Sequence, residues 1–155
     1  MDDCVLLVEG EKRISQMVEG LGGEFTYCTL GEPLDVEKLL AGENMPAFDA
    51  LGAWLFHTAT GGTLLPPPSN APEWYLGEAL DAHVWLMYQP DVNFLKSPEA
   101  ALTLSRAKAI AEWGRARGDG KRHLVFAPAK YMSNKQLSEH GIDYAPLPFA
   151  LYREG

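Results

Sequence analysis

The chain has 155 residues, a length typical of one domain with a sizeable hydrophobic core. Its hydrophobic fraction of 46% and charged fraction of 22% match globular proteins and exclude a disordered or fibrous chain. The formal net charge of −8 argues against a nucleic-acid partner, because phosphate binding depends on clustered Lys and Arg side chains.

The sequence also predicts a location. No apolar run approaches the roughly 20 residues that a bilayer-spanning helix needs, and the first residues lack the basic and then apolar pattern of a secretory signal. Cys4 and Cys28 each lie in an apolar stretch, where a thiol is more typically a small buried hydrophobe than a disulfide partner or metal ligand. We therefore expect a cytoplasmic protein without membrane contact.

The first third of the chain predicts two strands and two helices. Residues 4–8 form a short apolar run typical of a buried strand, followed by a helix that ends at Gly20. Residues 24–30 are rich in β-formers and alternate in polarity, which predicts a second strand. Asp35 is placed to cap a short helix through Leu40.

The middle third predicts a helix, a surface loop and a hairpin. An apolar stripe over residues 48–57 favours a helix. The Pro-rich stretch 61–72 cannot sustain regular hydrogen bonding and is expected to be a surface loop. Residues 73–78 and 83–88 flank a turn, which predicts an antiparallel hairpin whose second strand, apolar on both faces, is central in the sheet.

The last third predicts a helix–strand–helix–strand order. Ser97, followed by Pro and Glu, is typical of a helix start, and that helix should run to about Arg117. Residues 123–127 then read as a strand. Asn134 is expected to cap a short helix to His140, and residues 142–152 to form an edge strand because they contain two prolines.

Together these elements predict an α/β fold. We expect residues 1–155 to form a single domain with a mixed β-sheet of about five to six strands and flanking helices. The loop at 61–72 is the one candidate hinge.

Motifs for independent catalysis do not occur. A methyl transferase acting on a base needs a Gly-rich cofactor loop and an Asp/Asn-Pro-Pro-aromatic loop, and the triple proline at 66–68 matches neither. The four histidines lack metal-ligand spacing and are interpreted as ordinary surface or core residues. A hydrolase built on Cys28 is the least favoured alternative, because burial in a strand keeps a thiol protonated. We therefore assign no catalytic, cofactor-binding or metal-binding residue.

Positive charge is concentrated at the end of the chain. Residues 1–99 carry 4 basic and 16 acidic side chains, whereas residues 100–155 carry 9 basic and 5 acidic ones. Six basic residues around the predicted long helix are candidates for contact with a DNA backbone, against the alternative of a solvated helix face. They are Arg106, Lys108, Arg115, Arg117, Lys121 and Arg122.

Four tryptophans complete the candidate residues. Trp54 and Trp113 are expected on helices, and Trp74 and Trp85 on strands. Their favoured interpretation is as core or interface anchors, and the alternative is stacking on a flipped or single-stranded base.

Several segments resemble a known family in that family's order. Residues 25–34, Phe-Thr-Tyr-Cys-Thr-Leu-Gly-Glu-Pro-Leu, are similar to the aromatic strand and Leu-Gly-Glu/Asp-Pro segment that follows the catalytic region of type III-like site-specific DNA methyltransferases. Residues 54–61 resemble that family's helix ending in an aromatic residue, Thr and Gly. Residues 102–104 with 107–110 resemble its amphipathic helix, and residues 123–129 resemble its strand and Ala-Pro-Ala turn.

The resemblance implies a C-terminal, non-catalytic domain of a larger enzyme that methylates adenine N6, with S-adenosylmethionine as the cofactor of the parent enzyme and not of this fragment. It implies the remainder of the methyltransferase, a second copy or a restriction subunit as partners. We expect a role in subunit assembly first and auxiliary contact with the DNA backbone through residues 106–122 second.

Overall fold

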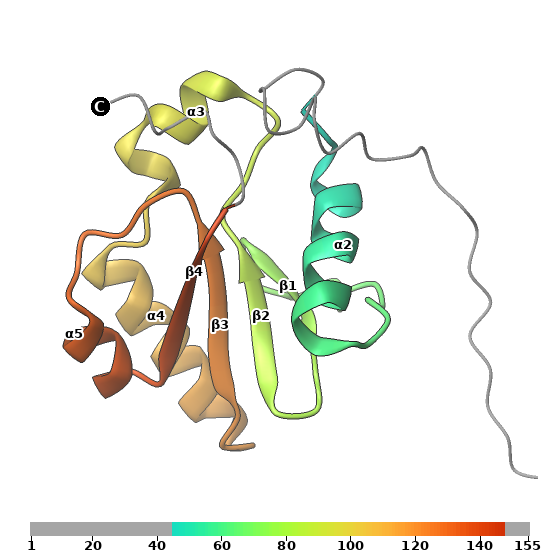
Figure 1. Ribbon diagram of the computed structural model, residues 1–155. Coiled ribbons are helices and arrows are strands. Elements are labelled where there is room, and N and C mark those ends of the chain that lie inside the picture. The colour runs from blue at the N-terminus through green and yellow to red at the C-terminus, as the bar shows by residue number, and fades with distance from the viewer. Residues whose placement is uncertain (1–44, 148–155) are drawn as a thin grey trace, which may run out of the picture. The chain divides into compact units, whose positions relative to one another are not determined.

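The computed structural model describes residues 45–147, all of which lie in one structural unit. The expected elements of the first third therefore lie outside the described residues. The described part is an α/β domain built on a mixed four-stranded sheet in the order β1-β2-β3-β4 (Figure 1). Five to six strands were expected, and the two further ones, at 4–8 and 24–30, fall outside this range.

The sheet combines a hairpin with two parallel crossovers. Strands β1 (Tyr75–Glu78) and β2 (Ala82–Leu86) pair antiparallel, as predicted. Strand β3 (Arg122–Ala127) pairs parallel with β2, and β4 (Ile142–Pro146) pairs parallel with β3 at the edge. Every residue of β2 is buried, which confirms the predicted central strand covered on both faces.

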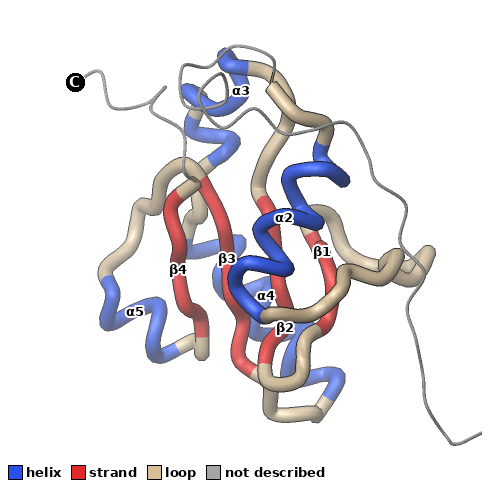
Figure 2. Tube along the Cα trace, turned by 45° about the vertical axis from the view of Figure 1, so that its right-hand side comes forward, coloured by secondary structure: helices blue, strands red, loops and turns tan. Residues whose placement is uncertain are grey.

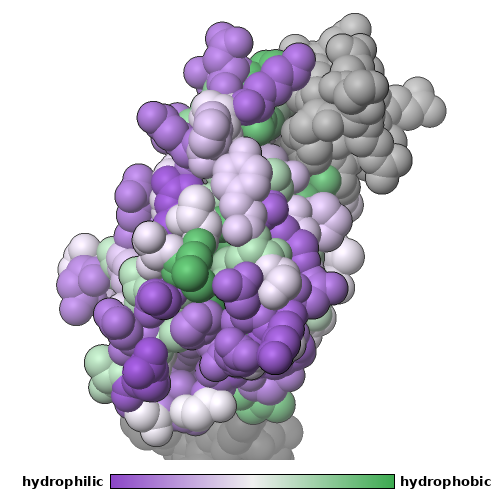
Figure 3. Space-filling model, turned by 90° about the vertical axis from the view of Figure 1, so that its left-hand side faces the viewer, coloured by the Kyte–Doolittle hydropathy of each residue, from purple (hydrophilic) through white to green (hydrophobic). Residues whose placement is uncertain are grey.

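Helices cover both faces of the sheet (Figures 1 and 2). The helix predicted at 48–57 is α2 (Phe48–Thr60), which packs on one face and ends at a left-handed Gly61. On the other face lie α4 (Leu104–Arg117) and α5 (Asn134–Glu139). Seen from the α5 side, the surface is largely hydrophilic, with small separate apolar areas (Figure 3).

Strand alternation divides the core into two clusters. On the α2 face, Leu51 and Leu55 of the helix pack with Val84 and Leu86 of β2. On the α4 face, the intervening residue Trp85 packs with α4 and α5. The central sheet is therefore buried between two apolar layers.

The long helix begins later than the sequence predicts. A short helix, α3 (Val92–Lys96), comes first. Ser97 follows it and starts only a 3-10 turn, η1 (Pro98–Ala100), in the connection to α4. The reason is that Leu102 takes an extended conformation: its N–H donates to the Ala129 carbonyl and its carbonyl accepts from Tyr131. A helical backbone cannot make those bonds, so α4 starts at Leu104.

Three smaller details also differ. Thr103 caps α4, accepting from the Arg106 N–H. Ser133, not Asn134, caps α5, because its hydroxyl and the Gln136 side chain form a reciprocal capping box. Trp74 lies in the turn before β1 rather than on the strand.

A close approach between α2 and β1 requires Gly52. A Cβ built there would lie 2.4 Å from Cδ1 of the buried Leu76. Gly52→Ala should therefore lower the free energy of unfolding by about 1–3 kcal/mol through overpacking, although alanine ordinarily stabilises a helix by about 1 kcal/mol relative to glycine. Urea denaturation measures the change.

The matched control is the exposed neighbour, Ala53→Gly, which should also destabilise, by about 1 kcal/mol, for the ordinary reason of helix propensity. A more stable Gly52→Ala protein would contradict the close approach.

Candidate functional site

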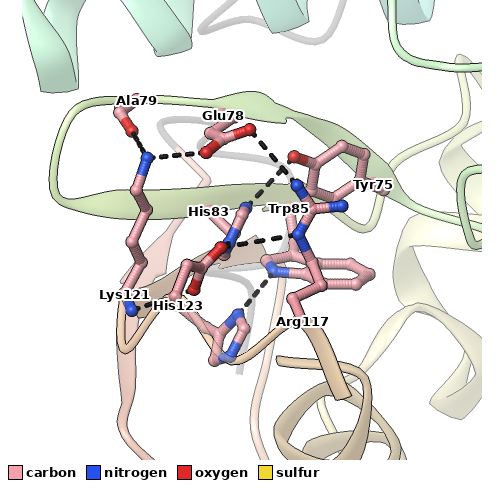
Figure 4. A network of polar contacts seen from close by, with 9 residues as sticks. Tyr75, Glu78, Ala79, His83, Trp85, Arg117, Lys121 and His123 are labelled. Carbon is pink, nitrogen blue, oxygen red and sulfur yellow. Dashed lines mark hydrogen bonds and ion pairs between the residues drawn. The ribbon is translucent and has the colours of Figure 1, made fainter. Parts of the chain in front are cut away.

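Two histidines meet near the start of the two interior strands of the sheet. His83 of β2 and His123 of β3 are register partners on adjacent parallel strands, and their rings stack at 5.6 Å between centroids. Their side chains are almost fully buried on the α4 face, next to Tyr75 and Trp85 (Figure 4). The Trp113 ring of α4 also lies against both histidines.

His83 bridges three segments of the chain. Its Nε2 lies 2.7 Å from Oδ2 of Asp119, and its Nδ1 lies 3.1 Å from the Tyr75 hydroxyl. Because an ionised carboxylate only accepts hydrogen bonds, Nε2 carries the proton and donates to Asp119. In this tautomer Nδ1 is the acceptor, so Tyr75 donates to it.

Asp119 is held as an anion. The Lys121 backbone N–H donates to its Oδ1 at 3.1 Å, and this bond, followed by the bond from His83, lowers the pKa of Asp119 to about 2. The carboxylate is therefore an acceptor for His83 across the ordinary pH range.

His123 has a fixed tautomer. The Trp85 indole Nε1–H donates to His123 Nδ1 at 3.2 Å, and since an indole nitrogen only donates, the proton of His123 lies on Nε2. Nε2 faces Gly114 of α4, where a Cβ would come within 2.2 Å of it. Burial, with a smaller contribution from His83, lowers the pKa of His123 below its ordinary value of 6.5.

Charged side chains close the network at its outer edge. Lys121 Nζ lies 2.6 Å from Glu78 Oε1 and also donates to the Ala79 carbonyl. Arg117 reaches both Glu78, at 3.4 Å, and Asp119, at 3.5 Å, and its guanidinium lies over the Trp113 ring. The Lys121 hydrogen bond is the main cause of a lowered pKa at Glu78.

The order hydroxyl, imidazole, carboxylate is that of a nucleophile with its base and orienting group. Here, however, the Tyr75 side chain is only 6% exposed, and burial raises its pKa to about 12. A protonated, covered hydroxyl is a poor nucleophile at neutral pH. The geometry therefore favours a structural network over a catalytic one.

One set of these atoms has the proximity of metal ligands. Glu78, His83 and Asp119 each place one ligand atom within 4.8 Å of the others. To bind a cation there, His83 would have to lose its hydrogen bond to Asp119. Glu78 would also have to break its ion pairs with Lys121 and Arg117. The three side chains are thus arranged for hydrogen bonds and ion pairs rather than for coordinating a metal ion.

The six predicted DNA-contact residues do not form one patch. On α4, Arg106 and Arg117 project from one side and Lys108 and Arg115 from the opposite side, following the helical period of 3.6 residues. Arg106 donates through Nη1 to the Glu99 and Ala101 carbonyls, the latter at 2.7 Å.

Three of the six are neutralised by carboxylates. Arg117 and Lys121 share Glu78, and Arg122 lies between Asp81, at 3.1 Å, and Asp143, at 2.6 Å. The Asp143 bond is the main cause of a raised pKa at Arg122. Lys108 and Arg115 are exposed and have no carboxylate partner within the described residues.

The histidine network was not predicted from the sequence. His83 and His123 were interpreted as ordinary surface or core residues, and the structure places both in the core. One signal was present: each histidine is the second residue of its strand, so parallel pairing in that register brings the rings together. Cys28, the least favoured nucleophile, lies outside the described residues.

Comparison of the chain with models of known protein families, with curated proteins and with solved structures found no match. Among the helices of residues 45–147, none has both the length and the apolar character needed to cross a membrane.

Acid should weaken the fold through His123. Its pKa is lower folded than unfolded, so the unfolded chain binds more protons below pH 6.5, and stability is present above that pH and lost as pH falls toward the lowered pKa. The free energy of unfolding, measured in urea, should therefore decrease from about pH 8 to about pH 5. The contribution of Asp119 is lost only lower, between its ordinary 3.8 and about 2.

In His123→Asn the amide oxygen can still accept from Trp85, but the titrating group is gone, so the pH dependence should become shallower. His140→Asn, at a partly exposed histidine outside this network, is the control. An unchanged pH slope in His123→Asn would refute the assignment.

Proposed function

We propose that this chain is a non-catalytic C-terminal domain of a cytoplasmic, site-specific DNA adenine-N6 methyltransferase of the type III restriction-modification class, and that it serves subunit assembly. Its partners are the remainder of the methyltransferase, which binds S-adenosylmethionine, and a second copy or a restriction subunit.

The observation that carries assembly over DNA contact is the pairing of charge. The cations at the β1–β2 end of the sheet, Arg117, Lys121 and Arg122, are each bonded to carboxylates. A phosphate would have to displace those acids, which lie in and beside the β1–β2 turn (Glu78 and Asp81) and in β4 (Asp143). This lowers the affinity expected for a polyanion.

The family-like segments give further support. Residues 54–61 form the second half of α2 and its glycine end. Residues 102–104 with 107–110 form the start of α4 and the residues just before it, and residues 123–129 form most of β3 with the turn after it. Segments that resemble the family thus coincide with the helix on each face and with a central strand. This is the arrangement expected if they preserve one domain.

Contact with the DNA backbone is the second candidate, favoured by Lys108 and Arg115. Both are exposed on one side of α4 without a carboxylate partner in the described part of the chain. Two such charges support only weak, strongly salt-dependent binding.

Assembly is tested by mixing the chain with the catalytic region of a type III-like methyltransferase from the same genome. Light scattering after size-exclusion chromatography should show a complex, and adenine methylation by the catalytic region should rise when the chain is added. Absence of both a complex and an effect on methylation would overturn the proposal.

DNA contact is tested separately with a fluorescent duplex at low and moderate salt. We expect at most weak binding that Lys108→Glu/Arg115→Glu abolishes, with Lys135→Glu, an exposed cation on α5, as the control. Tight binding that survives the double variant would show that residues other than these carry the contact.

A further inference from the structure

Trp74 has a backbone conformation that bulky residues rarely adopt. Its φ is +69°, in the left-handed region, and it is the only residue other than glycine with a positive φ among those described. The conformation is held by β pairing, because the Trp74 carbonyl accepts from the Leu86 N–H at 2.8 Å. Such strain persists where the surrounding structure over-determines it, and it is concentrated at ligand-binding positions.

The left-handed turn puts two consecutive side chains on the same face of the sheet. In a regular strand Trp74 would point away from the face that Tyr75 occupies. Instead, Trp74 and Tyr75 both pack against the α4-side cluster. The strained backbone therefore brings a third indole to the side of the sheet where Trp85 and Trp113 already lie.

The result is a cavity with aromatic walls. It has a volume of about 320 Å³. Its floor is formed by buried Trp85, Met87 and Ile110, and Trp74 and Trp113, both partly exposed, form walls. Phe94 of α3 stacks against Trp74 at 5.7 Å and 28°, so the indole is a supported platform.

A cation stands at the rim. Arg106 lines the cavity, as does the exposed Glu73, to which it is not bonded. The two hydrogen bonds of Arg106 both use Nη1 and go to backbone carbonyls. Of the five N–H donors of a guanidinium, three thus have no partner within the described residues. Unlike Arg117, Lys121 and Arg122, this arginine has no carboxylate bonded to it there.

We propose that this cavity binds a nucleotide, with the base stacked on Trp74 and a phosphate at Arg106. An apolar platform suits the face of any nucleobase, and stacking on an aromatic side chain is tolerant of base identity. The guanidinium supplies the charge that the phosphate requires. This binding site goes beyond the proposed role in assembly and does not depend on it.

The same chemistry has two sources, a free mononucleotide and a residue of single-stranded DNA. The probes are AMP, adenosine and a short oligo(dA). Binding of each is monitored through the indole N–H resonances in two-dimensional NMR spectra. The Trp74 resonance is identified by its loss in Trp74→Gly, a substitution that tolerates the left-handed backbone.

We expect AMP to shift the Trp74 resonance saturably, and Trp74→Gly to weaken AMP binding, measured by calorimetry, by roughly tenfold or more. Arg106→Met should weaken AMP but leave adenosine unchanged. Trp54→Ala, a partly buried indole on α2 and the opposite face, is the matched control and should bind normally. Oligo(dA) binding more tightly than AMP would assign the site to single strands, and the reverse to a free nucleotide.

Saturable binding of N-acetyltryptophanamide without binding of AMP or oligo(dA) would overturn the proposal and assign the cavity to a protein side chain. No saturable shift with any probe, in a protein whose circular dichroism is native, would also overturn it.

Discussion

The bond between His83 and Asp119 is the constraint on which the described domain depends. The His83 side chain has no solvent exposure, and a buried polar group left without partners costs about 1–3 kcal/mol. Both ring nitrogens must therefore find partners inside the protein. Asp119, in the turn between α4 and β3, satisfies one nitrogen, and Tyr75 of β1 satisfies the other. A single side chain thereby fixes the positions of three segments.

Two glycines, one on either side of Asp119, allow the backbone of that turn to place the carboxylate. Gly118 and Gly120 both have φ of +70°, the left-handed region that glycine adopts without strain, and they flank Asp119. Gly118 ends α4, and its N–H returns to the Gly114 carbonyl. The carboxylate between them then receives the Lys121 N–H and His83 together. A Gly-Asp-Gly sequence that looked like an ordinary helix end is thus also the source of the acceptor that the core requires.

Short-range patterns predicted the elements, and long-range pairing decided the rest. The α2 stripe, the β1–β2 hairpin and the central position of β2 follow from periodicity within a few residues. The start of α4 could not be predicted in this way. Leu102 forms backbone hydrogen bonds with residues 129 and 131, which no local propensity reveals. The network was missed for the same reason: His83 and Asp119 are 36 residues apart, and only the sheet register joins them.

The charge distribution also shows that local sequence does not reveal long-range partners. The basic excess of residues 100–155 suggested a surface for polyanions, but the acids that balance it come largely from the other part of the chain. Glu78 and Asp81, at the β1–β2 turn, bond to Arg117, Lys121 and Arg122 at the same end of the sheet. The net charge of residues 100–155 therefore overstates the positive charge that is free to bind an anion. Arg106, in contrast, bonds only to backbone carbonyls among the described residues and lies beside a mainly apolar cavity. A cation that is not paired with a carboxylate and lies next to aromatic rings is a more selective feature than a basic stretch, because a ligand must both carry an anion and stack a planar group to use it fully.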